Sequence, residues 1–340
     1  DAPRWDQNTL VPIWSATKGP AAATLLLALE KAGLSVHTPV ADLWPELRAA
    51  RETELTVGQV LAHRSGLAAL DPDNRPAIHQ HREVVRALER QEPFWQPNFS
   101  HGYHPRTSGA LLEELVRRVT NGTSLGRFWK EQFALPLGID VFIGGLGASE
   151  VDRLATMYPP ESLQPPPAET AFYAKLADPE SLSLAAFSSP GGMRGLGSIN
   201  KLEYLQPGIP SLGGVASARG LAKFYAVLAN RGRWKGVQVL SEKTVAACSV
   251  PLSEGEDLTL KLPTAFSTGF VLDPVDPETG QKIRSLFGSS RRSFGQPGAG
   301  GSHAFADPEN GISFAYVMNQ MRTGILPNEK STGLVNLMYS

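Results

Sequence analysis

The stretch WSATKGP, residues 14–20, decides how the rest of the chain is interpreted. It places a serine hydroxyl and a lysine amine three residues apart at the expected start of a helix, an S-x-x-K pattern. Because a helical turn holds about 3.6 residues, Ser15 and Lys18 would share one face, with the amine in reach of the hydroxyl. A lysine removed from water binds its proton less tightly and can serve as the base that a serine nucleophile needs.

The simpler interpretation is that Ser15 only caps a helix, which is the usual role of a serine at such a position. The following residues favour the catalytic interpretation. Pro20 suits a first helical turn, and residues 21–29 are apolar on nearly all faces, so the helix belongs in a core. A nucleophile at the tip of a buried helix is held rigidly, and the helix N-terminus can supply half of an oxyanion hole.

The composition is that of an ordinary globular protein. With 340 residues, 41% of them hydrophobic and 19% charged, the chain is long enough for one large domain or two lobes. The net charge of -1 gives no electrostatic reason to expect nucleic acid or an anionic membrane as a partner. The single cysteine, Cys248, excludes an internal disulfide and a cysteine-based metal cluster, and we expect its thiol to be buried.

No metal or cofactor is expected from these patterns, and the oligomeric state is left open. No apolar run approaches the length of about 18 residues that a membrane-spanning helix needs. Residues 1–11 lack the basic and apolar segments of a signal peptide, which favours a cytoplasmic location.

A second informative stretch covers residues 99–109, a loop ahead of an expected amphipathic helix. It contains Tyr103, whose hydroxyl could take part in proton transfer, although a loop tyrosine more often packs its ring and forms one hydrogen bond. His104 is the local competitor for a catalytic role. The residues themselves leave open which of the two rings faces the cleft.

The C-terminal third changes from a helical to a strand period. Strands are expected over residues 267–272, 302–307 and 312–319, and the last two are joined by an Asn-Gly turn typical of a hairpin. The glycine-rich stretch 294–302 precedes this hairpin. Such glycines let a backbone approach a ligand closely and could supply the second N–H of an oxyanion hole, although a tight turn or bulge is the alternative.

Three motifs in this order, the S-x-x-K at Ser15, the loop tyrosine Tyr103 and the glycine-rich strand at 296–298, resemble the serine β-lactamase and penicillin-binding-protein superfamily. The similarity is greatest to its esterase branch, the family VIII carboxylesterases. The segment LAHRSGL at 61–67 looks like the L-x-H-x-S-G-L segment of that family. The similarity extends over nearly the whole chain.

The resemblance implies an α/β (α+β) fold, in which helices flank an antiparallel β-sheet and a helical lobe is inserted. Residues 1–340 would form one catalytic domain. Its α/β lobe would comprise about 1–35 and 215–340, and its helical, loop-rich lobe about 36–214.

Family members usually carry several dozen residues before the nucleophile, which contribute sheet strands. Ser15 lies close to the first residue, so the expectation is that N-terminal strands are missing or that the sheet is smaller. The apolar helix over 19–32 would then be covered by missing strands, a partner chain or a C-terminal helix around 333–338.

The resemblance also implies the catalytic roles. Ser15 would be the nucleophile, Lys18 its activating partner, and Tyr103 the tyrosine of the family's Y-x-N motif. The backbone N–H groups of Ser15 and Ala299 would be the oxyanion donors. An acyl-enzyme on Ser15 would be hydrolysed by a water activated at Lys18 and Tyr103.

Substrate would contact the residues at the family's K-T-G position and the residue after the tyrosine, namely Gln296, Pro297, Gly298 and His104. The sequence differs from the family motifs at two of these positions. His104-Pro105 replaces the x-N half of Y-x-N, and the neutral Gln296 replaces a lysine or histidine that would meet a substrate carboxylate.

Other cations near this position in the sequence are Arg291, Arg292 and His303, of which the two arginines are expected to be solvated. The function expected is therefore that of a serine hydrolase cleaving small carboxylic esters. The alternatives are a β-lactamase or D-Ala-D-Ala peptidase, and a catalytically silent binding or scaffold protein on the same fold.

Overall fold

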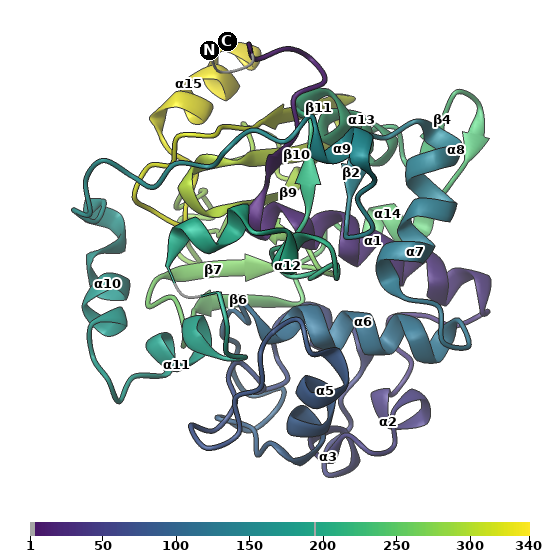
Figure 1. Cartoon of the computed structure of the whole chain (residues 1–340), viewed down its shortest axis with the longest axis vertical. Coiled ribbons are helices and arrows are strands. Elements are labelled where there is room, and N and C mark those ends of the chain that lie inside the picture. Colours follow the sequence, from purple (N-terminus) through teal and green to yellow (C-terminus); the bar gives the residue numbers. More distant parts are fainter. Residues whose placement is uncertain (1–3, 194) are drawn as a thin grey trace.

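The computed structural model describes residues 4–193 and 195–340, and its largest sheet has six antiparallel strands in the spatial order β11-β10-β9-β8-β7-β6 (Figure 1). The bounds of these strands are Ser253–Glu256 (β6), Pro263–Phe266 (β7), Val271–Leu272 (β8), Phe294–Pro297 (β9), His303–Asp307 (β10) and Ile312–Tyr316 (β11). A three-stranded sheet of order β1-β3-β2 comprises Val11–Pro12 (β1), Val141–Phe142 (β2) and Val215–Ala216 (β3). A separate hairpin pairs Arg233–Trp234 (β4) with Val237–Gln238 (β5).

Helices surround the sheets (Figure 1). Most elements between α1 and α13 are helical. Their bounds are Lys18–Lys31 (α1), Val40–Leu43 (α2), Arg48–Arg51 (α3), Val57–Leu61 (α4), His81–Arg90 (α5), Thr107–Val119 (α6), Leu125–Trp129 (α7), Leu135–Leu137 (α8), Ala148–Val151 (α9), Thr170–Leu176 (α10), Leu182–Ser188 (α11), Leu202–Leu205 (α12), Ala218–Ala229 (α13), Glu242–Ala247 (α14) and Glu329–Met338 (α15). The 3-10 turns are Trp14–Thr17 (η1), Pro167–Glu169 (η3), Leu196–Asn200 (η4) and Ala299–Gly301 (η5), and Lys130–Ala134 (η2) is a π-helical turn.

The predicted hairpin near the C-terminus is confirmed, because β10 pairs with β11 in antiparallel register. Side chains alternate along β10. Ala304 and Ala306 face the main core, where α13 packs on the sheet, whereas Phe305 faces a separate apolar cluster on the other side. The strand predicted over 267–272 is shorter, because residues 267–270 form a tight turn in which the Ser267 N–H donates to Phe270 O at 2.9 Å.

The apolar helix α1 is covered by elements of the chain itself. Its residues from Lys18 to Leu29 are buried, and α6, α7 and β9 pack around it (Figure 1). The C-terminal helix, one of the three alternatives expected to cover α1, packs elsewhere. That helix, α15, packs Val335 against Phe287 and Phe305. The amphipathic α6 supplies the cover, because its apolar stripe faces α1 and its charged face is turned outward.

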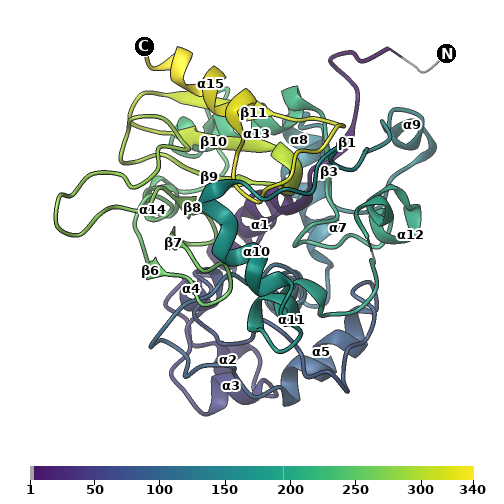
Figure 2. The same cartoon turned by 90° about the vertical axis from the view of Figure 1, so that its left-hand side faces the viewer.

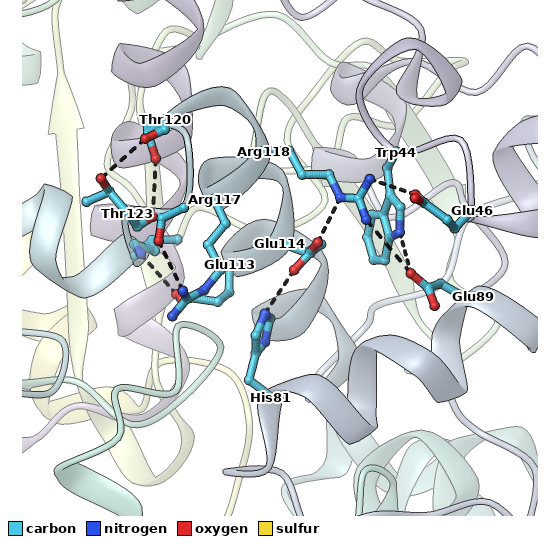
Figure 3. A network of polar contacts seen from close by, with 12 residues as sticks. Trp44, Glu46, His81, Glu89, Glu113, Glu114, Arg117, Arg118, Thr120 and Thr123 are labelled. Atoms are coloured by element: carbon cyan, nitrogen blue, oxygen red, sulfur yellow. Dashed lines mark hydrogen bonds and ion pairs between the residues drawn. The ribbon is translucent and has the colours of Figure 1, made fainter.

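The outer face of α6 is tied to its neighbours by a network of charges, shown in Figure 3. Arg118 bonds Glu114 at 2.7 Å and Glu46 at 2.6 Å, and its guanidinium lies over the ring of Trp44. Single exposed ion pairs contribute little, but several that share one partly buried arginine hold a helix more firmly. The network matters for the site because α6 begins four residues after Tyr103.

Two features concern the helical part of the chain. The charged segment over 82–91 resembles a solvated surface element in sequence, but it lies in α5, which buries Val84, Val85, Ala87 and Leu88 against the core. The proline-rich region from about 144 to 210 contains the short helices α9 to α12, separated by irregular segments. Of these, α10 and α11 lie at the front of the molecule in Figure 2, with α10 beside the strands of the main sheet and α11 below it. Among the described residues, no helix has the length and apolar character needed to cross a bilayer.

Candidate active site

Ser15 lies in η1, immediately before α1, as its S-x-x-K spacing predicts. Lys18 Nζ is 3.3 Å from Ser15 Oγ. Thr17 holds the turn, because its hydroxyl donates to Trp14 O at 2.6 Å and accepts the Gly214 N–H at 2.9 Å. Trp14 has a φ of 48°, a left-handed conformation that is rare for a bulky residue and typical of functional sites.

The surroundings of Lys18 remove its amine from water. Only 4% of the residue is exposed, and Nζ is 2.7 Å from Ser211 O and 3.0 Å from Pro105 O. Burial lowers the pKa of Lys18 well below its ordinary value. A neutral amine has two N–H donors and one lone pair. If the two carbonyls take both donors, the lone pair is left to accept the Ser15 hydroxyl.

Tyr103 converges on the same point. It lines the same cavity as Ser15, and Lys18 Nζ lies 4.8 Å from the centre of its ring. Burial raises the pKa of Tyr103, and the nearby Asp257 carboxyl acts in the same direction. The phenol therefore keeps its proton near neutral pH and acts as a donor. The structure brings Ser15, Lys18 and Tyr103 together.

The Tyr103 loop is anchored by Asp257, a residue that the sequence reasoning did not single out. Both carboxylate oxygens accept the Tyr103 N–H at 3.0 Å, and Oδ1 also accepts the N–H groups of Thr259 and Leu260 at 2.8 Å. Burial raises the pKa of Asp257 to about 6. In sequence, an acidic residue between strands usually indicates a solvated turn, so no signal marks this contact.

Asp257→Asn is expected to lower kcat for ester hydrolysis by about 10-fold or more, since a hydrogen bond to a charged group contributes about 1.5–3 kcal/mol. The reason is that the backbone of the proton donor Tyr103 loses its fixed position. Steady-state kinetics would measure kcat and KM separately. The exposed neighbour Glu256→Gln is the matched control. An Asn variant with unchanged kcat would contradict this positioning role.

The same substitution should change how stability depends on pH. Because the folded pKa of about 6 lies above the ordinary value of 3.8, the folded state binds this proton more tightly. The stability contributed by protonated Asp257 is therefore complete below pH 3.8 and is lost as the pH rises to about 6. In Asp257→Asn, the decline of the unfolding free energy across this window should be smaller.

Two backbone N–H groups are placed where an oxyanion could be held. Ser15 and Ala299 each lie in the first turn of a 3-10 helix, where N–H groups have no intrahelical acceptor. Both residues border the same two cavities. The assignment of Ser15 and Ala299 as oxyanion donors stays a prediction, and their shared position beside both cavities is compatible with it.

Gly298 allows this arrangement, because the end of β9 passes directly beside the turn that carries Ser15. A Cβ atom on Gly298 would overlap the carbonyl oxygen of Ile13 and lie 3.3 Å from Ala16 N. The close approach predicted from the glycine-rich stretch is therefore an approach to the protein's own backbone. Gly298 supports the nucleophile and is absent from the lining of the described cavities beside Ser15.

The other predicted substrate contacts separate into two groups. Gln296 and Pro297 line one cavity beside Ser15. His104 does not reach it, because its side chain is fully buried, its Nδ1–H donates to Gly102 O at 2.6 Å, and its Nε2 lies 2.8 Å from Ser65 Oγ. Adjacent side chains on an extended loop point in opposite directions, so Tyr103 and His104 cannot both face the nucleophile.

One cation that lines a cavity beside Ser15 was not expected from the sequence. Arg291 and Arg292 are exposed, and His303 is fully buried with its pKa lowered to about 3 by desolvation. Arg284 instead lines the cavity that contains Tyr103 and Gln296. Within residues 4–193 and 195–340, no three His, Cys, Asp or Glu side chains are grouped so that they could hold a metal ion.

The chain is similar to known proteins over nearly its whole length. The chain is 28% identical over 337 residues to the esterase/beta-lactamase LipL of Mycobacterium tuberculosis (strain ATCC 25618 / H37Rv), covering 98% of this chain and 75% of LipL. Its fold matches that of a penicillin-binding protein homologue from Caulobacter crescentus, with a TM-score of 0.83 and 30% identity over 99% of this chain and 85% of the homologue.

A family VIII carboxylesterase matches with a TM-score of 0.78 and 31% identity, covering 97% of this chain and 83% of that protein. EstA from Arthrobacter nitroguajacolicus Rue61a matches with a TM-score of 0.79 and 26% identity, covering 98% and 84% of the two chains. The family model named Beta-lactamase matches residues 1–330. With this match and the antiparallel sheet and helices of its fold, the chain belongs to the β-lactamase family.

Proposed function

We propose that the protein is a serine hydrolase that cleaves carboxylic esters through an acyl-enzyme on Ser15. The observation that carries the proposal is the state of Lys18, an amine removed from water and bonded to two carbonyls beside a serine hydroxyl. Esterases among the similar proteins support the same reaction class. A catalytically silent scaffold would gain nothing from burying a lysine in this way.

In the acylation half-reaction, Ser15 Oγ attacks the ester carbonyl carbon as its proton passes to the lone pair of Lys18. The carbonyl oxygen becomes an oxyanion held by the N–H groups of Ser15 and Ala299. As the bond to the alcohol breaks, the phenol of Tyr103 donates its proton to the leaving oxygen. Lys18 then returns the serine proton to Tyr103, so that no net charge remains.

In the deacylation half-reaction, water takes the place of the alcohol. It attacks the acyl carbon as its proton passes, by way of the Tyr103 hydroxyl, to the lone pair of Lys18, and Ser15 Oγ then leaves with that proton from Lys18. The neutral forms of Lys18 and Tyr103, which burial favours, are the ones that this sequence of transfers needs.

A β-lactamase or D-Ala-D-Ala peptidase is the second candidate, and one observation favours it. Substrates of these enzymes carry a carboxylate, and an unpaired carboxylate is costly to bury. Arg284 lines the cavity with Tyr103 and could meet such a group. Against this, the Arg284 guanidinium already donates to Pro263 O, and Gln296 next to the cleft carries no charge.

We predict that p-nitrophenyl butyrate is hydrolysed with a much higher kcat/KM than nitrocefin by one preparation of the protein. Gln296→Lys should raise kcat/KM for nitrocefin, because it supplies a cation at the end of β9. If nitrocefin is the better substrate of the unmodified protein, the esterase proposal fails. Arg284→Gln would then show whether Arg284 is the cation that serves the carboxylate.

A further inference from the structure

Two cavities meet at Ser15. The smaller has a volume of about 70 Å³ and the larger about 510 Å³. Ser15 and Ala299 border both of them, so the candidate nucleophile and one oxyanion donor stand at the boundary. Phe187 and Ile325 also border both and separate them. An ester bonded to Ser15 would therefore extend one of its two halves into each cavity.

Tyr103 distinguishes the two cavities chemically, because it lines the smaller one and is absent from the lining of the larger. The group that donates a proton to the leaving oxygen must lie on the side of the alcohol. The smaller cavity therefore receives the alcohol. Most of its lining is apolar, and Thr264, Arg284 and Gln296 are polar side chains within it.

The larger cavity is left for the acyl group, and most of its lining is apolar, as in the smaller cavity. Its walls are built by α10 and α11, by the segment after α11 and by the segment after β11, and include Phe172, Leu176, Met193, Leu196 and Met321. Arg106 is the buried charge at this wall. Its Nη2 bonds Gly191 O at 3.1 Å and Gly192 O at 2.8 Å, whereas its buried Nε has no hydrogen-bond partner among the described residues.

The position of α10 and α11 over this cavity is fixed by specific contacts. The buried Glu169 carboxylate, just before α10, accepts the N–H groups of Ile325 and Leu326 at 2.9 and 3.0 Å. Arg106 Nη1 lies 3.4 Å from Phe187 O on α11. These hydrogen bonds join α10 to the segment after β11 and α11 to Arg106. The elements around the larger cavity are therefore held in fixed positions.

From this geometry we infer that the preferred substrate is an ester of a bulky apolar acid with a small alcohol, the acyl chain lying under α10 and α11. The inference rests on the proposed esterase function and names its substrate class. Each methylene that leaves water for an apolar pocket should raise kcat/KM by about fourfold at most, corresponding to about 0.8 kcal/mol. The preferred acyl chain is then longer than the small groups expected from the sequence.

Two substrate series test the assignment. The first varies the acyl chain of p-nitrophenyl esters from acetate to decanoate. The second keeps an octanoyl group and varies the alcohol from methyl to octyl. We expect kcat/KM to rise along the first series to octanoate at least, and to fall along the second. A maximum at acetate or butyrate in the first series would overturn the inference.

Two variants, each filling one cavity, test which cavity binds which half of the ester. Leu176→Trp fills the larger cavity and Val271→Trp the smaller. Leu176→Trp should lower the octanoate-to-acetate ratio about 10-fold or more, and Val271→Trp should lower the octyl-to-methyl ratio instead. Ratios taken within one preparation cancel differences in the folded fraction. Leu196→Trp, at a wall residue that is 37% exposed, repeats the first change at a more tolerant position.

The outcomes separate this inference from the proposed function. If the effects of Leu176→Trp and Val271→Trp are exchanged, the assignment of the two cavities is reversed and the inference fails, while the esterase remains. If no ester of either series is hydrolysed and no serine-directed phosphonate labels the protein, the proposed function fails instead.

Discussion

Ser15→Ala is expected to abolish ester hydrolysis, with kcat/KM reduced on the order of 10³-fold or more. The hydroxyl that forms the acyl bond is gone, and the neighbouring groups only hold and move its proton. Lys18→Met should cause a loss of similar size, because a nucleophile and its base act as a unit. The double variant should therefore be no worse than either single variant. Turnover of p-nitrophenyl butyrate measures all three.

Covalent labelling supplies the control for this prediction. A fluorophosphonate should add its mass to the unmodified protein and to Ser35→Ala, which changes an exposed serine outside the site. Ser15→Ala should remain unlabelled. Full activity or full labelling of Ser15→Ala would end the assignment of Ser15 as nucleophile.

Gly298→Ala is expected to lower kcat about 100-fold, the cost of displacing a catalytic group by roughly 1 Å. The added methyl would overlap the carbonyl oxygen of Ile13, so either β9 or the turn that carries Ser15 must move. That movement separates the N–H of Ala299 from the N–H of Ser15 and opens the proposed oxyanion hole. Steady-state kinetics with p-nitrophenyl butyrate give kcat.

Gly333→Ala is the matched control, because an added Cβ there meets no atom within 4 Å and the residue lies inside α15. It should keep full activity and unfold at the same or a higher temperature. If Gly298→Ala keeps full activity as well, β9 does not support the nucleophile turn in the way described.

The features of this protein that follow from its residues alone are local ones. The reach from Lys18 to Ser15 follows from helical spacing, and the β10–β11 hairpin from an Asn-Gly turn between apolar runs. The helix over Ala218–Ala229 follows from its apolar period and from the Ser217 cap, which accepts the Gly220 N–H at 3.0 Å. Each depends on residues a few positions apart, whose geometry the backbone imposes.

The cover of α1 and the choice between Tyr103 and His104 depend on the tertiary structure, because both rest on contacts between distant residues. The residues show that α1 is apolar, but not that α6 and α7 cover it. The residues also do not show that Tyr103 faces Ser15. That choice depends on Asp257, which lies 154 residues farther along the chain and holds the Tyr103 N–H.

The chemical state of Lys18 is likewise a tertiary property. Its amine is held by carbonyl oxygens 87 and 193 residues away, and its pKa is lowered because the folded chain excludes water from it. Desolvation acts through space and has no local pattern in the sequence. The S-x-x-K spacing therefore predicts which two side chains can meet, whereas the folding of distant segments around them decides whether the lysine can act as a base.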